Sequence, residues 1–175
     1  MSKLAALSLL ATLTLAGCSA PTNPALVASI NLPASLSGEL RTNPLQWQVI
    51  TSFVDKSHST MSTLYGNDTA VQYSRSNSGH DYPDGSQLAL VTWTQREDPR
   101  WFGANIPGQL QSIEFVTVSQ ALSPSRPSSP QLIPSYFYQR FEGSLLKLSA
   151  SWNSTVPDLR VSLLLSLPAS PFPPN

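Results

Sequence analysis

The chain has 175 residues, the length of one ordinary domain, and its formal net charge is zero. Charged residues make up only 11% of it and form no basic run, so the sequence excludes nucleic acid as a partner. Apolar residues make up 41%, enough to bury a core, and sixteen prolines favour strands and loops over long helices.

The N-terminal residues have the three-part layout of a secretory signal. Lys3 is followed by an apolar run over residues 4–15 and then by small residues up to Cys18, the only cysteine. The run is shorter than the roughly 20 apolar residues that a permanent membrane-spanning helix needs. An N-terminal helix buried in the domain is the alternative, but it does not explain why small residues lead up to a lone cysteine. We therefore expect a signal peptide over residues 1–17.

The residues around Cys18 indicate a lipid anchor. Leu15-Ala16-Gly17-Cys18 resembles the cleavage box of bacterial lipoproteins. The resemblance implies cleavage after Gly17, a diacylglycerol on the Cys18 thiol and a fatty acid such as palmitate on the new amine. Because two acyl chains already give stable attachment, three would hold the protein on the bilayer. The position after Cys18 is Ser19 and not Asp, which resembles the pattern of lipoproteins sorted to the outer membrane. We therefore expect a bacterial envelope protein on the periplasmic face of the outer membrane.

Behind this anchor, composition divides the chain into a tether, one domain and a tail. Residues 18–33 are small, polar and interrupted by proline, which predicts a lipidated tether. We place the domain at residues 34–167, with an exposed, flexible Ser/Pro-rich loop at 119–135. Residues 168–175 are rich in proline, and we expect them to form a disordered tail.

Alternation of apolar and polar residues predicts a first strand at 45–54 and a second extended segment at 59–65. The inward face of the first strand would carry Leu45, Trp47, Val49 and Phe53. Gly66-Asn67-Asp68 suits a turn that also caps a short helix over residues 69–75.

The middle of the chain predicts a central strand. Pro83-Asp84-Gly85 is typical of a tight turn and leads into residues 86–95, which are apolar on both faces. Strands of this kind lie inside a sheet that is covered on both sides. A further strand is predicted at 110–120, with Ile113 and Phe115 inward and Glu114 on the other face.

The last third predicts a strand at 136–143, a turn near 149–155 and a closing helix over 155–167 with Thr155 as its cap. The leucine-rich run of that helix shows no clean amphipathic pattern, so a buried strand remains the alternative. The sequence thus predicts an α+β fold, mainly antiparallel β, as a curled sheet or small sandwich packed with one or two short helices.

Three features that recur in order carry a family resemblance. They are Trp47 before the first strand, the LYGND turn at 64–68, and the step from Tyr82 to Gly85 into a hydrophobic strand. Over roughly residues 44–118 the chain resembles the cytochrome P460 domain family. The resemblance implies a mainly antiparallel sheet curled or packed over a helix, which agrees with the strands predicted above.

The resemblance also implies haem chemistry, for which this sequence lacks the attachment residues. Haem members of the family are periplasmic c-type cytochromes; some oxidise hydroxylamine, and relatives bind small gases. Their haem is held by a Cys-x-x-Cys-His segment near the C-terminus. Here the one cysteine is Cys18, and no histidine follows His80. The stretch 73–85, where the enzymes carry a lysine crosslinked to haem, contains no lysine. We therefore expect no covalent haem.

His58 and His80, the only two histidines, are weak candidates for a metal or non-covalent haem site. They lie 22 positions apart, which is not a short ligand spacing, although residues distant in sequence can converge in a fold. Both lie among polar or turn residues, so plain surface histidines are the alternative. We expect no metal site.

Glu114 and three aromatic residues are candidates for a pocket. Glu114, between Ile113 and Phe115, would be a partly buried acid with a raised pKa, or would simply face solvent. Tyr82, Trp93 and Trp101 would line a ligand cavity or belong to the core.

The sequence does not support catalysis, because it has no Gly-x-Ser-x-Gly elbow, no phosphate-binding glycine loop and no evident base beside its serines. We interpret the protein as a membrane-anchored periplasmic lipoprotein whose cytochrome P460-like domain is a non-catalytic binding or structural module. The alternative is a redox enzyme or small-gas sensor with non-covalent haem or a metal. Its partners would be the membrane, through the lipid, and an envelope protein or a small ligand.

Overall fold

A computed structural model describes residues 31–36, 38, 40–76, 81–122 and 131–171. The chain divides into residues 1–30 and a unit that starts at Asn31. The predicted signal peptide, Cys18 and His80 lie outside the described residues.

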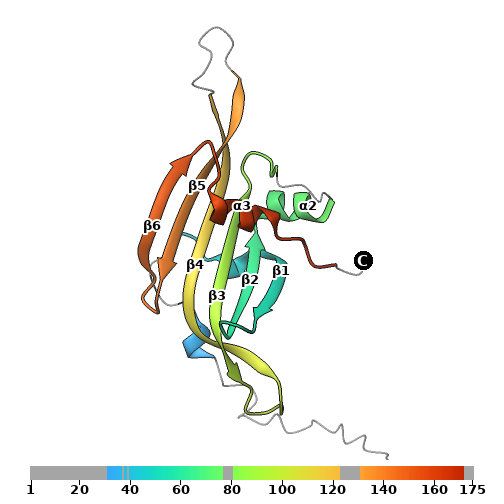
Figure 1. The fold of residues 1–175 in the computed structure, drawn as a ribbon, viewed down its shortest axis with the longest axis vertical. Helices are drawn as coiled ribbons and strands as arrows, with labels where there is room; N and C mark the ends of the chain where they lie inside the picture. Colours follow the sequence, from blue (N-terminus) through green and yellow to red (C-terminus); the bar gives the residue numbers. More distant parts are fainter. Residues whose placement is uncertain (1–30, 37, 39, 77–80, 123–130, 172–175) are drawn as a thin grey trace, which may run out of the picture. The chain divides into compact units, whose positions relative to one another are not determined.

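The described residues form one antiparallel sheet with two short helices. The elements in chain order are η1 (Leu32–Ala34), η2 (Pro44–Gln46), β1 (Gln48–Asp55), β2 (Thr60–Gly66), α2 (Asp68–Ser76), β3 (Gln87–Glu97), β4 (Asn105–Leu122), β5 (Leu132–Glu142), β6 (Lys147–Ser154) and α3 (Leu159–Ser166). The six strands are hydrogen-bonded in sequence order from β1 to β6, and the sheet is open (Figure 1). The predicted α+β, mainly antiparallel class is confirmed, as a single sheet.

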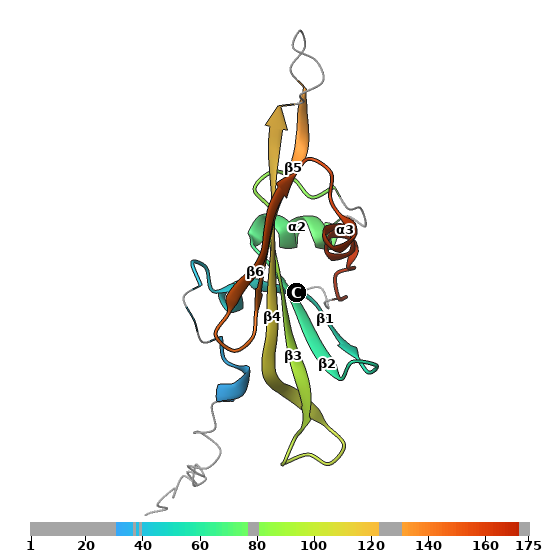
Figure 2. The ribbon, with the colours of Figure 1, turned by 60° about the vertical axis from the view of Figure 1, so that its left-hand side comes forward.

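Both helices lie on one face of the sheet, and the main core lies between them and the strands (Figure 2). The helices contribute small and branched apolar side chains, among them Ala70 and Val71 from α2 and Val161 and Leu164 from α3. The buried residues of the sheet in this cluster are Ile50, Leu64, Leu88, Leu90, Val116, Val118, Tyr136 and Tyr138, and Tyr82 joins them from the segment before β3. None of the helices in the described part of the chain is long and apolar enough to cross a membrane.

The opposite face of the sheet carries a smaller cluster around Trp93 and Ile113. The segment that precedes β1 covers it with Ala34 and Leu36, and the indole nitrogen of Trp93 donates a hydrogen bond of 2.8 Å to the Ala34 carbonyl. β3 is therefore covered on both sides, which confirms the prediction of a central strand.

Two predicted turns have the expected chemistry. The Asn67 side chain accepts hydrogen bonds from the backbone of Ala70 at 3.0 Å and of Gln87 at 3.1 Å, so it caps α2 and ties that helix to β3. Gly85 has φ +79°, a left-handed conformation that glycine adopts readily, and Ser86 closes the turn.

The first strand differs from its prediction in start and in facing. It begins at Gln48, because Pro44–Gln46 form a 3-10 turn. The pairing of β1 with β2 is irregular at position 50, so Ile50 and Thr51 are both buried although they are consecutive. Phe53, predicted inward, is 39% exposed. A strict two-residue period cannot anticipate such an irregularity.

The last third also differs from its prediction. The predicted turn near 149–155 is mostly β6, and the closing helix begins at Leu159. Its cap is Asp158, whose carboxylate accepts a hydrogen bond of 2.8 Å from the Val161 backbone, rather than Thr155.

Two predicted irregular segments are partly ordered. β4 continues to Leu122 and β5 starts at Leu132, so regular pairing enters the predicted loop 119–135 from both sides. In the predicted tail, the Ser170 backbone donates to the Ile50 carbonyl at 2.9 Å. The chain up to residue 170 is therefore held against β1.

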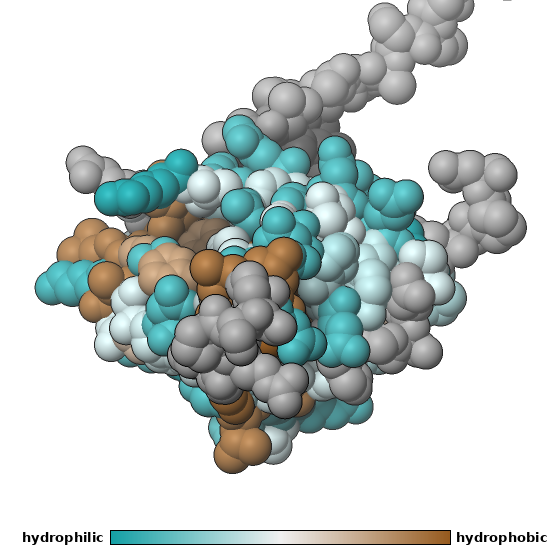
Figure 3. All heavy atoms as spheres, turned by 90° about the horizontal axis from the view of Figure 1, so that it is seen from above, coloured by the Kyte–Doolittle hydropathy of each residue, from teal (hydrophilic) through white to brown (hydrophobic). Residues whose placement is uncertain are grey.

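Not all large apolar side chains are buried. The surface around the β4–β5 end shows hydrophobic areas among hydrophilic ones (Figure 3). Leu122 and Leu132, at the adjoining ends of β4 and β5, are 66% and 59% exposed. Trp101 and Phe102, just ahead of β4, are exposed as well, so apolar side chains reach solvent near both ends of this strand.

Candidate functional site

A groove of about 430 Å³ lies on the sheet face that the helices leave uncovered. Alternation along the strands places it there, because Phe115 and Thr117 of β4 line it whereas Val118, one position on, packs in the helix-covered core. The lining residues are Leu40, Arg41, Thr42, Trp47, Gln87, Leu88, Phe115, Val116, Thr117, Phe137, Gln139, Phe141 and Leu148.

Aromatic rings form much of the groove. The ring centroids of Trp47 and Phe115 are 6.2 Å apart, and those of Phe115 and Phe141 are 6.0 Å apart, both edge to face. This geometry is favourable for aromatic pairs, because the positive edge of one ring meets the negative face of another. The rings come from three places, the residue before β1, the middle of β4 and the end of β5, so the sheet itself brings them together.

The polar groups of the groove are neutral except for one guanidinium. Thr42, Gln87, Thr117 and Gln139 offer hydroxyls and amides, and Arg41 offers a positive charge. Among the described residues that line the groove there is no carboxylate, imidazole or thiol. The arrangement can hold an apolar molecule and orient it by hydrogen bonds and one charge, but it supplies no nucleophile or general base.

Glu114 lies on the opposite, helix-covered face and is 1% exposed. Its carboxylate accepts hydrogen bonds of 2.7 Å from the Tyr138 hydroxyl and from Nε of Arg160, and a second from the Arg160 guanidinium. Nη1 of Arg140 is 3.9 Å away. These contacts tie α3, which carries Arg160, to β4 and β5.

The charge state of Glu114 follows from these contacts. Burial by itself would raise the pKa of its carboxyl, but the hydrogen bonds from Arg160 and Tyr138 and the positive charges of Arg160 and Arg140 outweigh it and hold the pKa below its ordinary value. Both expectations for this residue are corrected: it does not face solvent, and its pKa is not raised. The ionised carboxylate is buried and forms an ion pair with the partly exposed Arg160.

The aromatic residues that the sequence suggested for a pocket do not come together. Tyr82 is in the helix-covered core, with its ring centroid 4.8 Å from that of Tyr73, and burial raises its pKa to about 12. Trp93 lies in the cluster on the other face. Trp101 is 71% exposed in the turn between β3 and β4. None of the three, nor Glu114, lines the groove.

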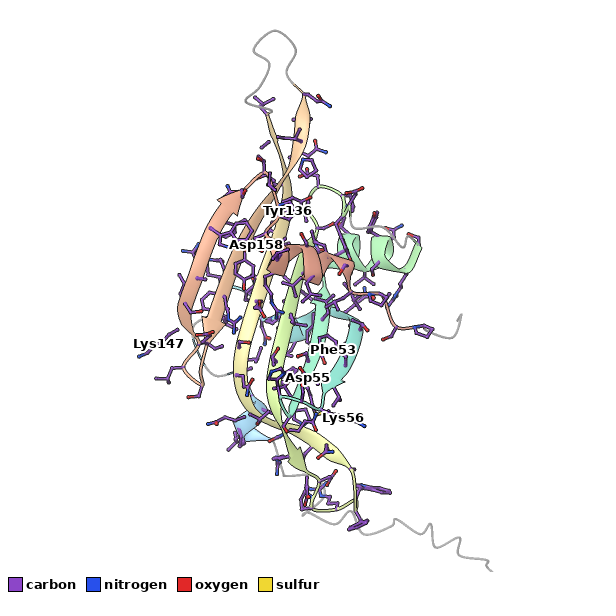
Figure 4. The ribbon with its side chains drawn as sticks, in the orientation of Figure 1. Phe53, Asp55, Lys56, Tyr136, Lys147 and Asp158 are labelled. Carbon is purple, nitrogen blue, oxygen red and sulfur yellow. The ribbon has the colours of Figure 1, made fainter. Side chains whose placement is uncertain are left out.

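His58 lies in the turn between β1 and β2, with its side chain 76% exposed. Its Nδ1 is 2.7 Å from the carboxylate of Asp55, which Figure 4 shows at the end of β1. Hydrogen bonds from Ser57 and His58 hold the pKa of Asp55 below its ordinary value. No group of three His, Cys, Asp or Glu side chains suited to a metal ion occurs within the described residues.

The groove residues on β5 were missed from the sequence, although a signal was present. In the run from Tyr136 to Phe141, Tyr136 and Tyr138 alternate with Phe137, so this strand is aromatic on both faces. An edge-proximal strand with two apolar faces needs a cover on each, and here one face receives the helices while the other borders the groove.

Fold and groove together define a small open antiparallel sheet with helices on one face and a ligand-sized hollow on the other. The family model described as Cytochrome P460 matches residues 45–127. The chain thus contains a cytochrome P460-like domain. No curated protein matches the chain. The match runs from just before β1 to just beyond β4, so it includes Trp47 and Phe115 but not the groove residues of β5 and β6.

The family implies haem, and the groove residues do not fit an iron-bound haem. Protein ligands of haem iron are His, Cys, Met or Tyr side chains. None of the described residues lining the groove is of these types. Thioether attachment needs cysteines beside an axial histidine, and Cys18 is the only cysteine.

Proposed function

We propose that the protein is a membrane-anchored periplasmic lipoprotein whose cytochrome P460-like domain is a non-catalytic binding module without covalent haem. The groove would hold a small, flat, apolar molecule that carries an acidic group. The observation that supports this most is the groove lining itself: four aromatic rings, neutral polar groups and one guanidinium, with no carboxylate, imidazole or thiol among the described residues that line it.

The size and charge of the groove support the ligand class. A volume of about 430 Å³ falls within the roughly 300–1,000 Å³ typical of small-molecule sites. Aromatic walls favour a planar molecule, which can stack against them. The planar guanidinium of Arg41 suits a carboxylate or sulfonate, which it can bind with two parallel hydrogen bonds. The side chain of Arg41 makes no ion pair with the described residues, so its charge is available to a ligand.

Titration with 1-anilinonaphthalene-8-sulfonate, a flat aromatic anion, tests this proposal. Phe137 and Phe53 are each 39% exposed, but only Phe137 lines the groove. Phe53 is on β1, one edge strand of the sheet, whereas β6, which carries Lys147, is the other edge strand (Figure 4). Phe53 therefore serves as the control. Phe137→Ser should weaken binding at least several-fold, and Phe53→Ser should leave it unchanged. Equal effects of the two substitutions would place the dye elsewhere and contradict the proposal.

The contribution of Arg41 can be separated from that of the rings. Arg41→Gln should weaken binding of the sulfonate dye but not of N-phenyl-1-naphthylamine, which has a similar ring system and no acidic group. A loss of both dyes would mean that the substitution disturbs the groove rather than the charge.

The competing proposal is a redox enzyme or gas sensor with non-covalent haem, and the family match favours it. Titration of the purified protein with haemin distinguishes the two, with His58→Ala/His80→Ala as the variant. A Soret band that is shifted and sharpened relative to free haemin, and that the double substitution returns to the free form, would support the haem proposal. A titration in which the band stays that of free haemin, or in which the double substitution changes nothing, would contradict it.

A further inference from the structure

Two neighbouring aromatic side chains reach solvent in the turn between β3 and β4. Trp101 is 71% exposed, and Phe102 is fully exposed. Scattered exposed hydrophobic residues are normal on soluble proteins. Here two exposed aromatic residues are adjacent in sequence in the turn of one hairpin, which we call the aromatic turn (residues 98–104).

Hydrogen bonds fix the aromatic turn. The Asp98 backbone donates to the Ala104 carbonyl at 2.9 Å, and Ala104 donates to the Trp101 carbonyl at 3.0 Å. Gly103 has φ +77°, the left-handed conformation required at the third position of a type II turn. The Asp98 side chain accepts a further bond from the Arg100 backbone at 2.8 Å. A preformed turn loses little conformational entropy when its rings are buried against a partner.

The first described residue of the domain lies at the base of the same hairpin. The Asn31 amide donates to the Pro107 carbonyl at 2.6 Å, and the Arg96 guanidinium donates to the Asn31 side-chain oxygen at 3.3 Å. Arg96 pairs with Ile106 in the β3–β4 ladder, five positions before Trp101. At about 3.3 Å per residue along a strand, Trp101 is within roughly 17 Å of the Arg96 backbone, and Asn31 contacts the Arg96 side chain. Figures 1 and 2 both show η1 and the β3–β4 hairpin at the same end of the unit.

The position of Asn31 at the base of the hairpin points to the membrane as the partner of the aromatic turn. If Cys18 carries lipid, the chain between positions 18 and 31 can span at most about 45 Å, so Asn31, at the base of the hairpin, lies no farther than this from the bilayer. Tryptophan and other aromatic side chains favour the boundary between headgroups and hydrocarbon. The charged residues around the aromatic turn, Arg96, Glu97, Asp98 and Arg100, balance to zero, so the attraction does not depend on anionic lipid.

We propose that the aromatic turn inserts Trp101 and Phe102 into the interface of the membrane that carries the lipid anchor, as a second contact that fixes the orientation of the domain. This inference rests on the anchoring stated under the proposed function. The hairpin end then faces the bilayer, and none of the residues that line the groove belongs to the aromatic turn.

Quenching of tryptophan fluorescence by brominated lipid tests the insertion. The full chain is expressed, purified from membranes in detergent and reconstituted into vesicles of neutral phosphatidylcholine brominated on the acyl chains. We expect quenching of the wild-type protein, and at least a several-fold smaller quenched fraction for Trp101→Phe, which keeps an aromatic ring but removes the reporter. Trp152→Phe, in which a partly buried tryptophan of β6 is replaced, is the matched control: the emission lost to the brominated lipid should stay at the wild-type value, so the quenched fraction should not fall.

Failure of the insertion and failure of the anchor give different results. Resistance to extraction at alkaline pH reports the anchor alone, and Trp101→Ser/Phe102→Ser should remain as resistant as the wild type. A protein that resists extraction but shows no quenching overturns the insertion and leaves the anchor intact. A protein that is extracted but still quenched when added to vesicles supports the insertion without the anchor. Protection of Trp101 from iodide in native envelopes but not in vesicles would point to a protein partner and overturn the proposal.

Discussion

Replacing Glu114 by glutamine should destabilise the domain by a predictable amount. The substitution keeps the shape of the side chain but removes the charge that faces Arg160, and it presents an amide donor to guanidinium donors. Breaking a buried ion pair by changing one partner costs about 3–5 kcal/mol. Because the Arg160 side chain is 39% exposed and can recover contact with water, we expect the lower end of this range, about 3 kcal/mol.

The control is the neighbouring ion pair of the same sheet. Nε of Arg140 is 2.7 Å from the Glu142 carboxylate, but these side chains are 36% and 50% exposed. Solvent screening limits such pairs to less than about 1 kcal/mol, so Glu142→Gln should have a small effect. Urea unfolding followed by far-UV circular dichroism measures the free energy of unfolding of both variants and of the wild type.

The same experiment at lower pH tests the cause. The folded-state pKa of Glu114 lies below its ordinary value, so its ionisation contributes stability that is fully present above the unfolded-state pKa of about 4.3. This contribution is lost as the pH falls through the folded-state pKa. The difference in unfolding free energy between the wild type and Glu114→Gln should therefore be largest near neutrality and shrink in acid. A loss no larger than that of Glu142→Gln, or a gap that widens in acid, would refute the reasoning.

Three further substitutions test the packing and capping of the helices. Gly66→Ala should lower the free energy of unfolding in urea by about 1–3 kcal/mol. The reason is that a Cβ at this position would lie 2.7 Å from Cδ1 of buried Ile50 and 3.1 Å from Cβ of Ala70. An unchanged urea midpoint would show that the neighbouring side chains relax around the added methyl group. Asp158→Ala should cost about 1 kcal/mol by removing the cap of α3, whereas Thr155→Ala, at the cap that the sequence suggested, should cost little. The reverse order of these two effects would mean that the helix begins at Thr155.

Local patterns predicted the elements that depend on local chemistry. Residues 86–95 are apolar on both faces, and β3 is indeed the strand covered on both sides. Asn67 and Gly85 act as the turn residues that their types suggest. β6 was missed although Leu148, Ala150 and Trp152 alternate with polar residues, because serines on both sides of Trp152 favoured a turn.

The site depends on contacts between residues far apart in sequence, which local patterns do not encode. Glu114 was correctly placed on the face opposite Ile113, but its charge state depends on Arg160, which is 46 positions away and reaches it only because α3 folds over that face. The groove likewise requires Trp47, Phe115 and Phe141, which three separate segments supply. The pocket suggested from aromatic type alone grouped side chains that the sheet places on different faces.

Intact-mass spectrometry of the protein purified from the envelope of a host that also makes c-type cytochromes tests the central claim most directly. The account predicts a chain that begins at Cys18, carries three acyl chains and has no added mass of haem. A full-length, unacylated N-terminus or a covalently attached haem would contradict it.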